Sequence, residues 1–190
     1  WIPRGRVRPH EPLASAPCLE YLQAQLPDAG AGRVFGLGFN LVPNTGAAQG
    51  LADPRSVIDP LIYRPFWEFM DSEVAEPRRP AFLGFLKADR LDRRALEALS
   101  FMGVRYLVTT RSRSEILSAG TAWPLQLVQS GEMNVFENLR AWPRVFVLGR
   151  EGDTPVAARI TRYGPLEVEI AVPAVSGRLV LTDTSYPGWR

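Results

Sequence analysis

A helical pattern that runs directly into a strand pattern, over residues 88–110, constrains the fold of this chain most strongly. The stretch ADRLDRRALEALSFMG repeats apolar residues at helical spacing, namely Leu91, Ala95, Ala98, Leu99 and Met102. Asp89 is a suitable N-cap for this helix, and Gly103 is a suitable residue to end it. The following residues, VRYLVTT, are rich in β-branched and aromatic side chains. The sequence therefore predicts a helix that leads into a strand over 104–110.

A second buried-strand pattern, RVFGLGF over 33–39, lies upstream of this helix. Further helical segments are expected over 18–26 and from Asp59–Pro60 onward, where Asp59 can cap the helix and Pro65 interrupts it. A strand, then helices, then another strand is typical of a parallel pair covered by helices. We therefore predict that strands 33–39 and 104–110 lie side by side and parallel.

The pattern changes near residue 150. Before it, 125–129 and 133–137 read as a hairpin and 143–148 as a strand; after it, strands are expected at 157–163, 166–172 and 178–184. The predicted fold class is α/β, a mixed sheet with helical cover, followed by an antiparallel β region that is a truncated β-sandwich. We divide the chain into a linker over 1–17, an α/β subdomain over 18–150 and the β region over 151–190, the last incomplete at its C-terminal end.

Composition favours a folded, soluble segment. Hydrophobic residues make up 46% of the 190 residues and charged residues 22%, as in ordinary globular domains. The formal net charge is only +2, so no nucleic-acid partner is predicted. The sequence has no apolar run long enough to cross a membrane, and it starts without Met. We expect it to be part of a longer polypeptide.

The residue types needed for metal or nucleophilic chemistry are scarce. The chain has one His, His10 in a proline-rich stretch, and one Cys, Cys18. A zinc site or a Ser-His-Asp arrangement needs more ligands or bases than these, so neither a metal nor a catalytic residue is predicted. Gly36 and Gly38 supply only two of the three glycines of a dinucleotide-binding turn. Close strand packing explains them better, and no cofactor is expected.

Asp53, Arg55 and Trp67 are the candidate ligand-binding residues. Asp53 and Arg55 lie in an expected loop, and loops carry function more often than other segments do. The sequence leaves open whether Asp53 and Arg55 contact a ligand or only each other. Trp67 lies in an aromatic group that suits either a core or a platform for stacking a sugar.

Three phrases, in this order, resemble the C-terminal extracytoplasmic region of bacterial multi-pass membrane proteins of the YfhO-like type: MGVRYLVTT (102–110), MNVFENLRAWPRVFVL (133–148) and GRLVLTDTSYPGW (177–189). That family is similar to the GT-C glycosyltransferases, which use lipid-linked sugars. The stretch 41–61 also resembles a loop of the family, with Asp53, Arg55 and a later Asp-Pro-Leu. It departs from the family by one extra residue before Asp59 and by Ser56 where a glycine is usual.

The resemblance implies an accessory domain outside the cell membrane. Its partners would be the membrane-embedded part of the same polypeptide and a glycan or lipid-linked sugar. Catalysis in the family belongs to a loop among the membrane helices, so no catalytic residue is carried over to this chain. Arg4, Arg6 and Arg8 point the other way on location, because arginines beside a membrane helix favour the cytoplasmic side.

Two other classes of function stay open. A free-standing carbohydrate-binding or adhesion module would need an exposed aromatic platform, for which Trp67, Trp123 and Trp142 are candidates. A soluble nucleotide-using enzyme would be built on the unit 33–110.

Overall fold

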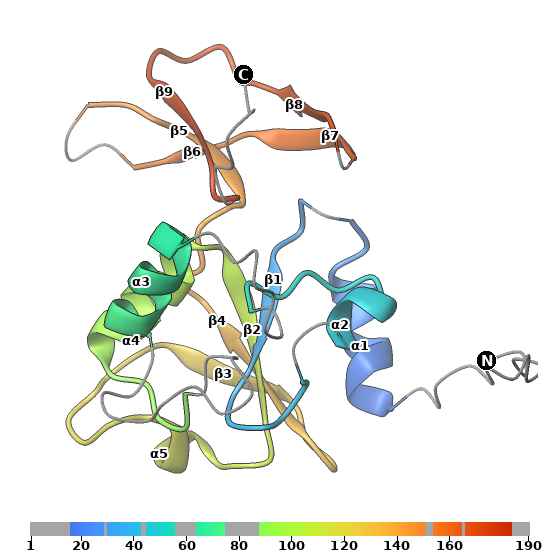
Figure 1. Cartoon of the computed structure of the whole chain (residues 1–190), viewed down its shortest axis with the longest axis vertical. Helices are drawn as coiled ribbons and strands as arrows, with labels where there is room; N and C mark the ends of the chain where they lie inside the picture. Colours follow the sequence, from blue (N-terminus) through green and yellow to red (C-terminus); the bar gives the residue numbers. More distant parts are fainter. Residues whose placement is uncertain are drawn as a thin grey trace, which may run out of the picture.

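The computed structural model describes residues 16–28, 30–42, 45–55, 64–74, 88–150, 154–164 and 166–183. Outside the described residues lie most of the expected linker with His10, the start of the helix expected from Asp59, and the end of the third phrase, residues 184–189. Figure 1 shows a sheet with helices on both sides and a second, all-β part beyond one end of it.

The central sheet has four strands: β1 (Arg33–Gly36), β2 (Val104–Thr109), β3 (Leu125–Gln129) and β4 (Asn134–Asn138). Their order in the sheet is β1-β2-β4-β3. β1 and β2 are parallel, whereas β4 is antiparallel to both β2 and β3. The predicted parallel pair and the predicted hairpin are therefore both confirmed.

Helices cover both faces of this sheet (Figure 1). On one face lie α3 (Arg64–Glu73) and α4 (Arg93–Phe101), and on the other α1 (Pro17–Gln25) and the short α2 (Thr45–Ala48). A single turn of helix, α5 (Arg113–Ile116), follows β2 and starts with a capping box between Ser112 and Glu115. None of the described helices has the length and apolar character needed to span a bilayer.

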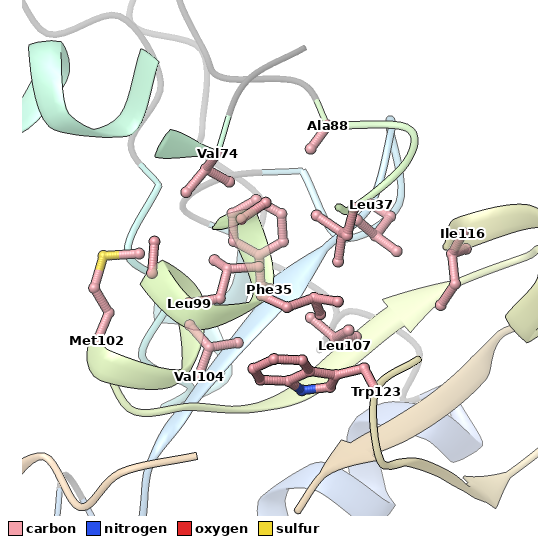
Figure 2. Close-up of a cluster of buried hydrophobic side chains, with 14 of the residues drawn as sticks. Phe35, Leu37, Val74, Ala88, Leu99, Met102, Val104, Leu107, Ile116 and Trp123 are labelled. Carbon is pink, nitrogen blue, oxygen red and sulfur yellow. The ribbon is translucent and has the colours of Figure 1, made fainter. Parts of the chain in front are cut away.

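Each face of the sheet has its own hydrophobic cluster because successive strand residues point to opposite sides. Phe35 and Leu107 join the cluster under α3 and α4, which Figure 2 shows together with Leu99 and Trp123. The cluster on the other face contains Leu22 of α1 together with Val34, Tyr106 and Val108.

Two expectations about helix starts need correction. The N-cap of α4 is Asp92, whose carboxylate accepts a hydrogen bond from the Ala95 N–H at 2.8 Å, and not Asp89. Asp89 forms an ion pair with Arg111 instead. Pro65 is the second residue of α3 and lies in its first turn, where the missing N–H of proline has no intrahelical partner to lose. The expected stop at Gly103 is confirmed, since Gly103 adopts φ +73° after the end of the helix.

The β region consists of two small antiparallel sheets. β5 (Val145–Leu148) lies between β6 (Val156–Ala157) and β9 (Arg178–Leu181), and β7 (Arg159–Tyr163) pairs with β8 (Val168–Ala171). We therefore count β5 with the β region, although the expected division placed residues up to 150 in the α/β subdomain. The predicted class, α/β followed by antiparallel β, is confirmed. Every described residue of 154–164 and 166–183 is exposed or only partly buried. The described part of these segments therefore has no core of its own, and its position depends on contacts with the rest of the chain.

Candidate functional site

Asp53 and Arg55 lie beside the carboxyl end of β1. The Val34 N–H donates to the Ala52 carbonyl at 2.9 Å, which draws the segment 51–55 alongside β1. Asp53 Oδ1 accepts hydrogen bonds from the Arg55 backbone N–H at 2.8 Å and from Arg55 Nε at 3.0 Å. Asp53 Oδ2 accepts one from Arg55 Nη2 at 2.6 Å. The side chains of Arg55 and Asp53 are only 1% and 4% exposed.

Arg55 also holds the loop that follows β1. Its Nη1 donates to the Gly36 carbonyl at 2.6 Å, and its Nη2 donates to the Leu41 carbonyl at 2.5 Å. Its guanidinium lies 4.8 Å from the centre of the Phe35 ring. β1 ends at Gly36, earlier than the expected residue 39, because the chain folds back here: a Cβ on Gly36 would stand 1.9 Å from the Asn40 carbonyl oxygen.

The Asp53–Arg55 pair therefore braces the loop 36–41. Burial raises the pKa of Asp53, and the hydrogen bonds and charge of Arg55 oppose that rise. Both carboxylate oxygens face Arg55, and Arg55 in turn holds two backbone carbonyls that would otherwise be buried without a donor. These contacts describe a structural role, and the ligand-binding role of Asp53 and Arg55 stays a prediction.

The three candidate tryptophans lie in different surroundings. Trp67 is partly buried in α3 and packs against the cluster under α3 and α4. Trp123 is 4% exposed, and its Nε1–H donates to Asn138 Oδ1 at 2.9 Å. Figure 2 shows its ring within the hydrophobic cluster. The expectation that Trp123 supplies an exposed platform is therefore wrong, because its ring belongs to the core. Trp142, like Trp67, is intermediate between buried and exposed.

Trp142 belongs to an aromatic patch, by which we mean Phe101, Trp142 and Phe146. The ring centroids lie 5.6 Å apart for Phe101 and Trp142, and 5.1 Å apart for Trp142 and Phe146, all in edge-to-face arrangements. Phe146 is fully buried, whereas Phe101 is 45% exposed. The patch thus has a buried base in β5 and an outer ring at the end of α4.

A polar cluster joins the α/β part to the β region. Asp183 Oδ1 accepts hydrogen bonds from Arg33 Nη2 and from Arg144 Nη2, the second at 2.6 Å, and Asp183 Oδ2 accepts one from the Tyr163 hydroxyl at 2.8 Å. Arg33 also donates to the Met102 carbonyl and to Thr182. We call Arg33, Arg144, Tyr163 and Asp183 the junction cluster.

Charge in the junction cluster is shared between two buried guanidinium groups and one carboxylate. Burial raises the pKa of Asp183, but the hydrogen bond and charge of Arg144 and the charge of Arg33 outweigh it and leave that pKa below its usual value. Burial, together with the like charge of Arg144, lowers the pKa of Arg33 to about 10. Burial and the bond to Asp183 raise the pKa of Tyr163. At neutral pH the carboxylate is therefore ionised and the phenol is protonated.

Sequence reasoning missed the junction cluster. In the sequence Arg33 is only the first residue of an expected strand. Its partner Asp183 is 150 residues away, so no local pattern connects the two. The available signal was indirect, since Arg144 and Asp183 both lie inside the phrases that carry the family resemblance.

Metal binding has no candidate group within the described ranges, where His, Cys, Asp and Glu nowhere gather in threes or more in a way that could hold an ion. Comparison with known proteins found no match to this chain among family models, curated proteins or solved structures.

Proposed function

We propose that this chain is a non-catalytic accessory domain of a polytopic membrane protein similar to the GT-C glycosyltransferases. It lies on the extracytoplasmic face of the membrane and works with the membrane-embedded part of the same polypeptide. The full protein acts on cell-envelope glycans with lipid-linked sugar donors, and this domain positions the glycan or covers the catalytic face.

One observation carries this proposal: the three phrases behind the family resemblance meet at one place in the fold. Gly103 of the first phrase packs on Arg144 of the second, so closely that a Cβ on Gly103 would stand 3.2 Å from Arg144 Cγ. Arg144 is bonded in turn to Asp183 of the third phrase. The second and third phrases also pair as strands, with Phe146 opposite Val180. Three segments that are far apart in sequence thus form one structural unit. This supports a shared fold, and not chance similarity of three short segments, as the reason for the resemblance.

The placement of the charged residues also supports an accessory role. Asp53 is bound to Arg55, and Asp183 is bound to Arg33 and Arg144. Asp53 thus positions Arg55, which binds backbone carbonyls, and Asp183 joins the two parts of the chain. A general acid or base must instead reach a reacting group.

A glycosyl-transfer assay tests the proposal. The 190-residue chain and the full polypeptide in membranes are each given a lipid-linked sugar donor and an acceptor glycan. We expect transfer by the full polypeptide only. Asp183→Asn in the full polypeptide should reduce transfer, because the β region is no longer held in place. Transfer by the 190-residue chain alone would overturn the non-catalytic assignment.

A free-standing carbohydrate-binding module is the second candidate function, and the half-exposed ring of Phe101 next to Trp142 favours it. The two candidates differ in their dependence on the membrane part. A free-standing module would bind a glycan equally well with and without the rest of the polypeptide, whereas an accessory domain would bind its acceptor more tightly within the full protein.

A further inference from the structure

We infer that the aromatic patch is a saccharide-contact site, with Phe101 and Trp142 as the contacting residues. The inference deepens the proposed function by naming the residues and the ligand class. It rests on that function only for the expectation of a cell-envelope glycan, since the stacking argument comes from the patch itself.

The patch is fixed in place before any ligand arrives. The backbone N–H of Trp142 donates to the Ser100 carbonyl at 2.9 Å, which ties the loop before β5 to the last turn of α4. Phe101 is the last residue of that helix, and its ring lies 6.3 Å from the ring of Phe146. Each ring is therefore held by edge-to-face contacts with the other two. A rigid aromatic surface loses little conformational entropy on binding.

The patch offers the two kinds of contact that a saccharide ring needs. A sugar ring has C–H groups on its faces and hydroxyl groups around its edge, so it can lie on an aromatic ring while its hydroxyls bond to neighbouring polar groups. Phe101 supplies exposed aromatic surface. Trp142 adds a partly exposed indole, whose N–H can only donate and therefore suits a hydroxyl oxygen.

A carboxylate lies close to this aromatic surface. Glu97 precedes Phe101 by four residues on α4, which places the two side chains on the same face of the helix. Glu97 is solvent-exposed and accepts a hydrogen bond from Arg93 Nε at 2.8 Å, so an oxygen of its carboxylate remains for a sugar hydroxyl.

The charges around the patch favour a neutral, polar ligand over a membrane surface or a nucleic acid. An anionic membrane or a phosphate backbone would require a basic face. On α4, Arg93 is paired with Glu97 and Arg94 with Glu73, and behind the patch Arg144 is paired with Asp183. The charges on α4 are thus balanced in pairs, and the surplus positive charge of the junction cluster lies on side chains that are only 8% and 3% exposed. The surface beside the patch is therefore not a basic face.

Nuclear magnetic resonance titration of the 190-residue chain with neutral oligosaccharides tests the inference. The probes are maltotetraose, cellotetraose and chitotetraose, each raised to 20 mM, and the readout is the indole N–H resonance of each tryptophan. We expect at least one oligosaccharide to shift the Trp142 resonance saturably, while the resonance of the buried Trp123 stays in place. Phe101→Ser should weaken that binding at least tenfold, while the rest of the spectrum shows that the chain stays folded.

Leu166→Ser is the matched control, because Leu166 is 97% exposed in the turn between β7 and β8 and does not belong to the patch. It should bind like the wild type. Absence of a Trp142 shift with all three oligosaccharides would overturn the inference, as would a shift that survives Phe101→Ser. The transfer assay decides the proposed function separately, since a non-catalytic accessory domain can hold a glycan through other residues.

Discussion

The Asp183→Asn substitution tests how the β region is held on the α/β part. In the wild type the Asp183 carboxylate accepts hydrogen bonds from two arginines and a tyrosine. The amide keeps the shape of the side chain but removes its negative charge, while Arg33 and Arg144 stay buried with side chains only 8% and 3% exposed. Removing one partner of a buried ion pair costs about 3–5 kcal/mol. Since asparagine still offers one acceptor oxygen, we expect a loss near the lower end, about 3 kcal/mol.

Urea unfolding at pH 7, followed by tryptophan fluorescence, measures the loss. A loss of about 3 kcal/mol lowers the midpoint by roughly 1.5 M for a slope of about 2 kcal/mol per M. Hydrogen exchange of the Thr182 amide measures the local effect of the substitution. The Thr182 N–H donates to the Arg144 carbonyl at 3.0 Å, so it is protected while the β region is held in place. We expect this amide to exchange about 100-fold faster in the variant. Glu167→Gln is the control: Glu167 is paired with Arg162 on the surface, and its loss should change stability by less than about 0.5 kcal/mol.

The pH dependence gives a second check on Asp183. Its folded-state pKa lies below the ordinary value of 3.8. The carboxylate therefore contributes stability that is fully present above that value and is lost as the pH falls through the folded-state pKa. The gap between the wild type and Asp183→Asn should stay constant from neutral pH down to about pH 5 and narrow under more acidic conditions. Two results would refute the role assigned to the junction cluster. One is a loss of stability in Asp183→Asn as small as that in the Glu167→Gln control, and the other is a loss that does not change with acidification.

Three further substitutions test other parts of the fold. Gly36→Ala should lower the free energy of unfolding, measured by thermal unfolding, by at least about 3 kcal/mol, because the new Cβ would clash with the backbone carbonyl of Asn40. Near-native stability would contradict the tight loop. Asp92→Ala removes the N-cap of α4 and should cost about 1 kcal/mol in the same assay, whereas no loss would mean that the cap is dispensable. Trp123→Phe removes the indole donor to Asn138 and some core volume, and should cost about 2 kcal/mol in urea unfolding; an unchanged midpoint would contradict its placement in the core.

Local patterns were sufficient to predict much of the fold. The helix over 93–101 and strand β2 were predicted because a 3.6-residue period gives way at Gly103 to a run of β-branched and aromatic residues. The β3–β4 hairpin was predicted from two such runs around a short polar turn. The N-cap of α4 was misplaced because Asp89 and Asp92 both suit a cap, and the ion pair that Asp89 makes with Arg111 cannot be seen in its local sequence.

The candidate site depended on contacts that local patterns do not contain. Charged residues are usually exposed, so nothing in the neighbourhood of Arg33 or Arg144 marked them as buried. Asp53 and Arg55 stood out in sequence only as loop residues, although their side chains point inward to brace the turn after β1. The sequence did not separate the buried Trp123 from Trp67 and Trp142, and only the packing of α4 against the loop before β5 places Trp142 next to Phe101.

Sequencing the gene on both sides of the codons for Trp1 and Arg190 tests the central claim most directly. The membrane-transferase proposal predicts several apolar runs of about 20 residues upstream of Trp1, with an acidic residue in the first loop between them. A start codon or a simple secretory signal immediately upstream of Trp1, with no such runs, would contradict the proposal and leave the carbohydrate-binding module as the better account.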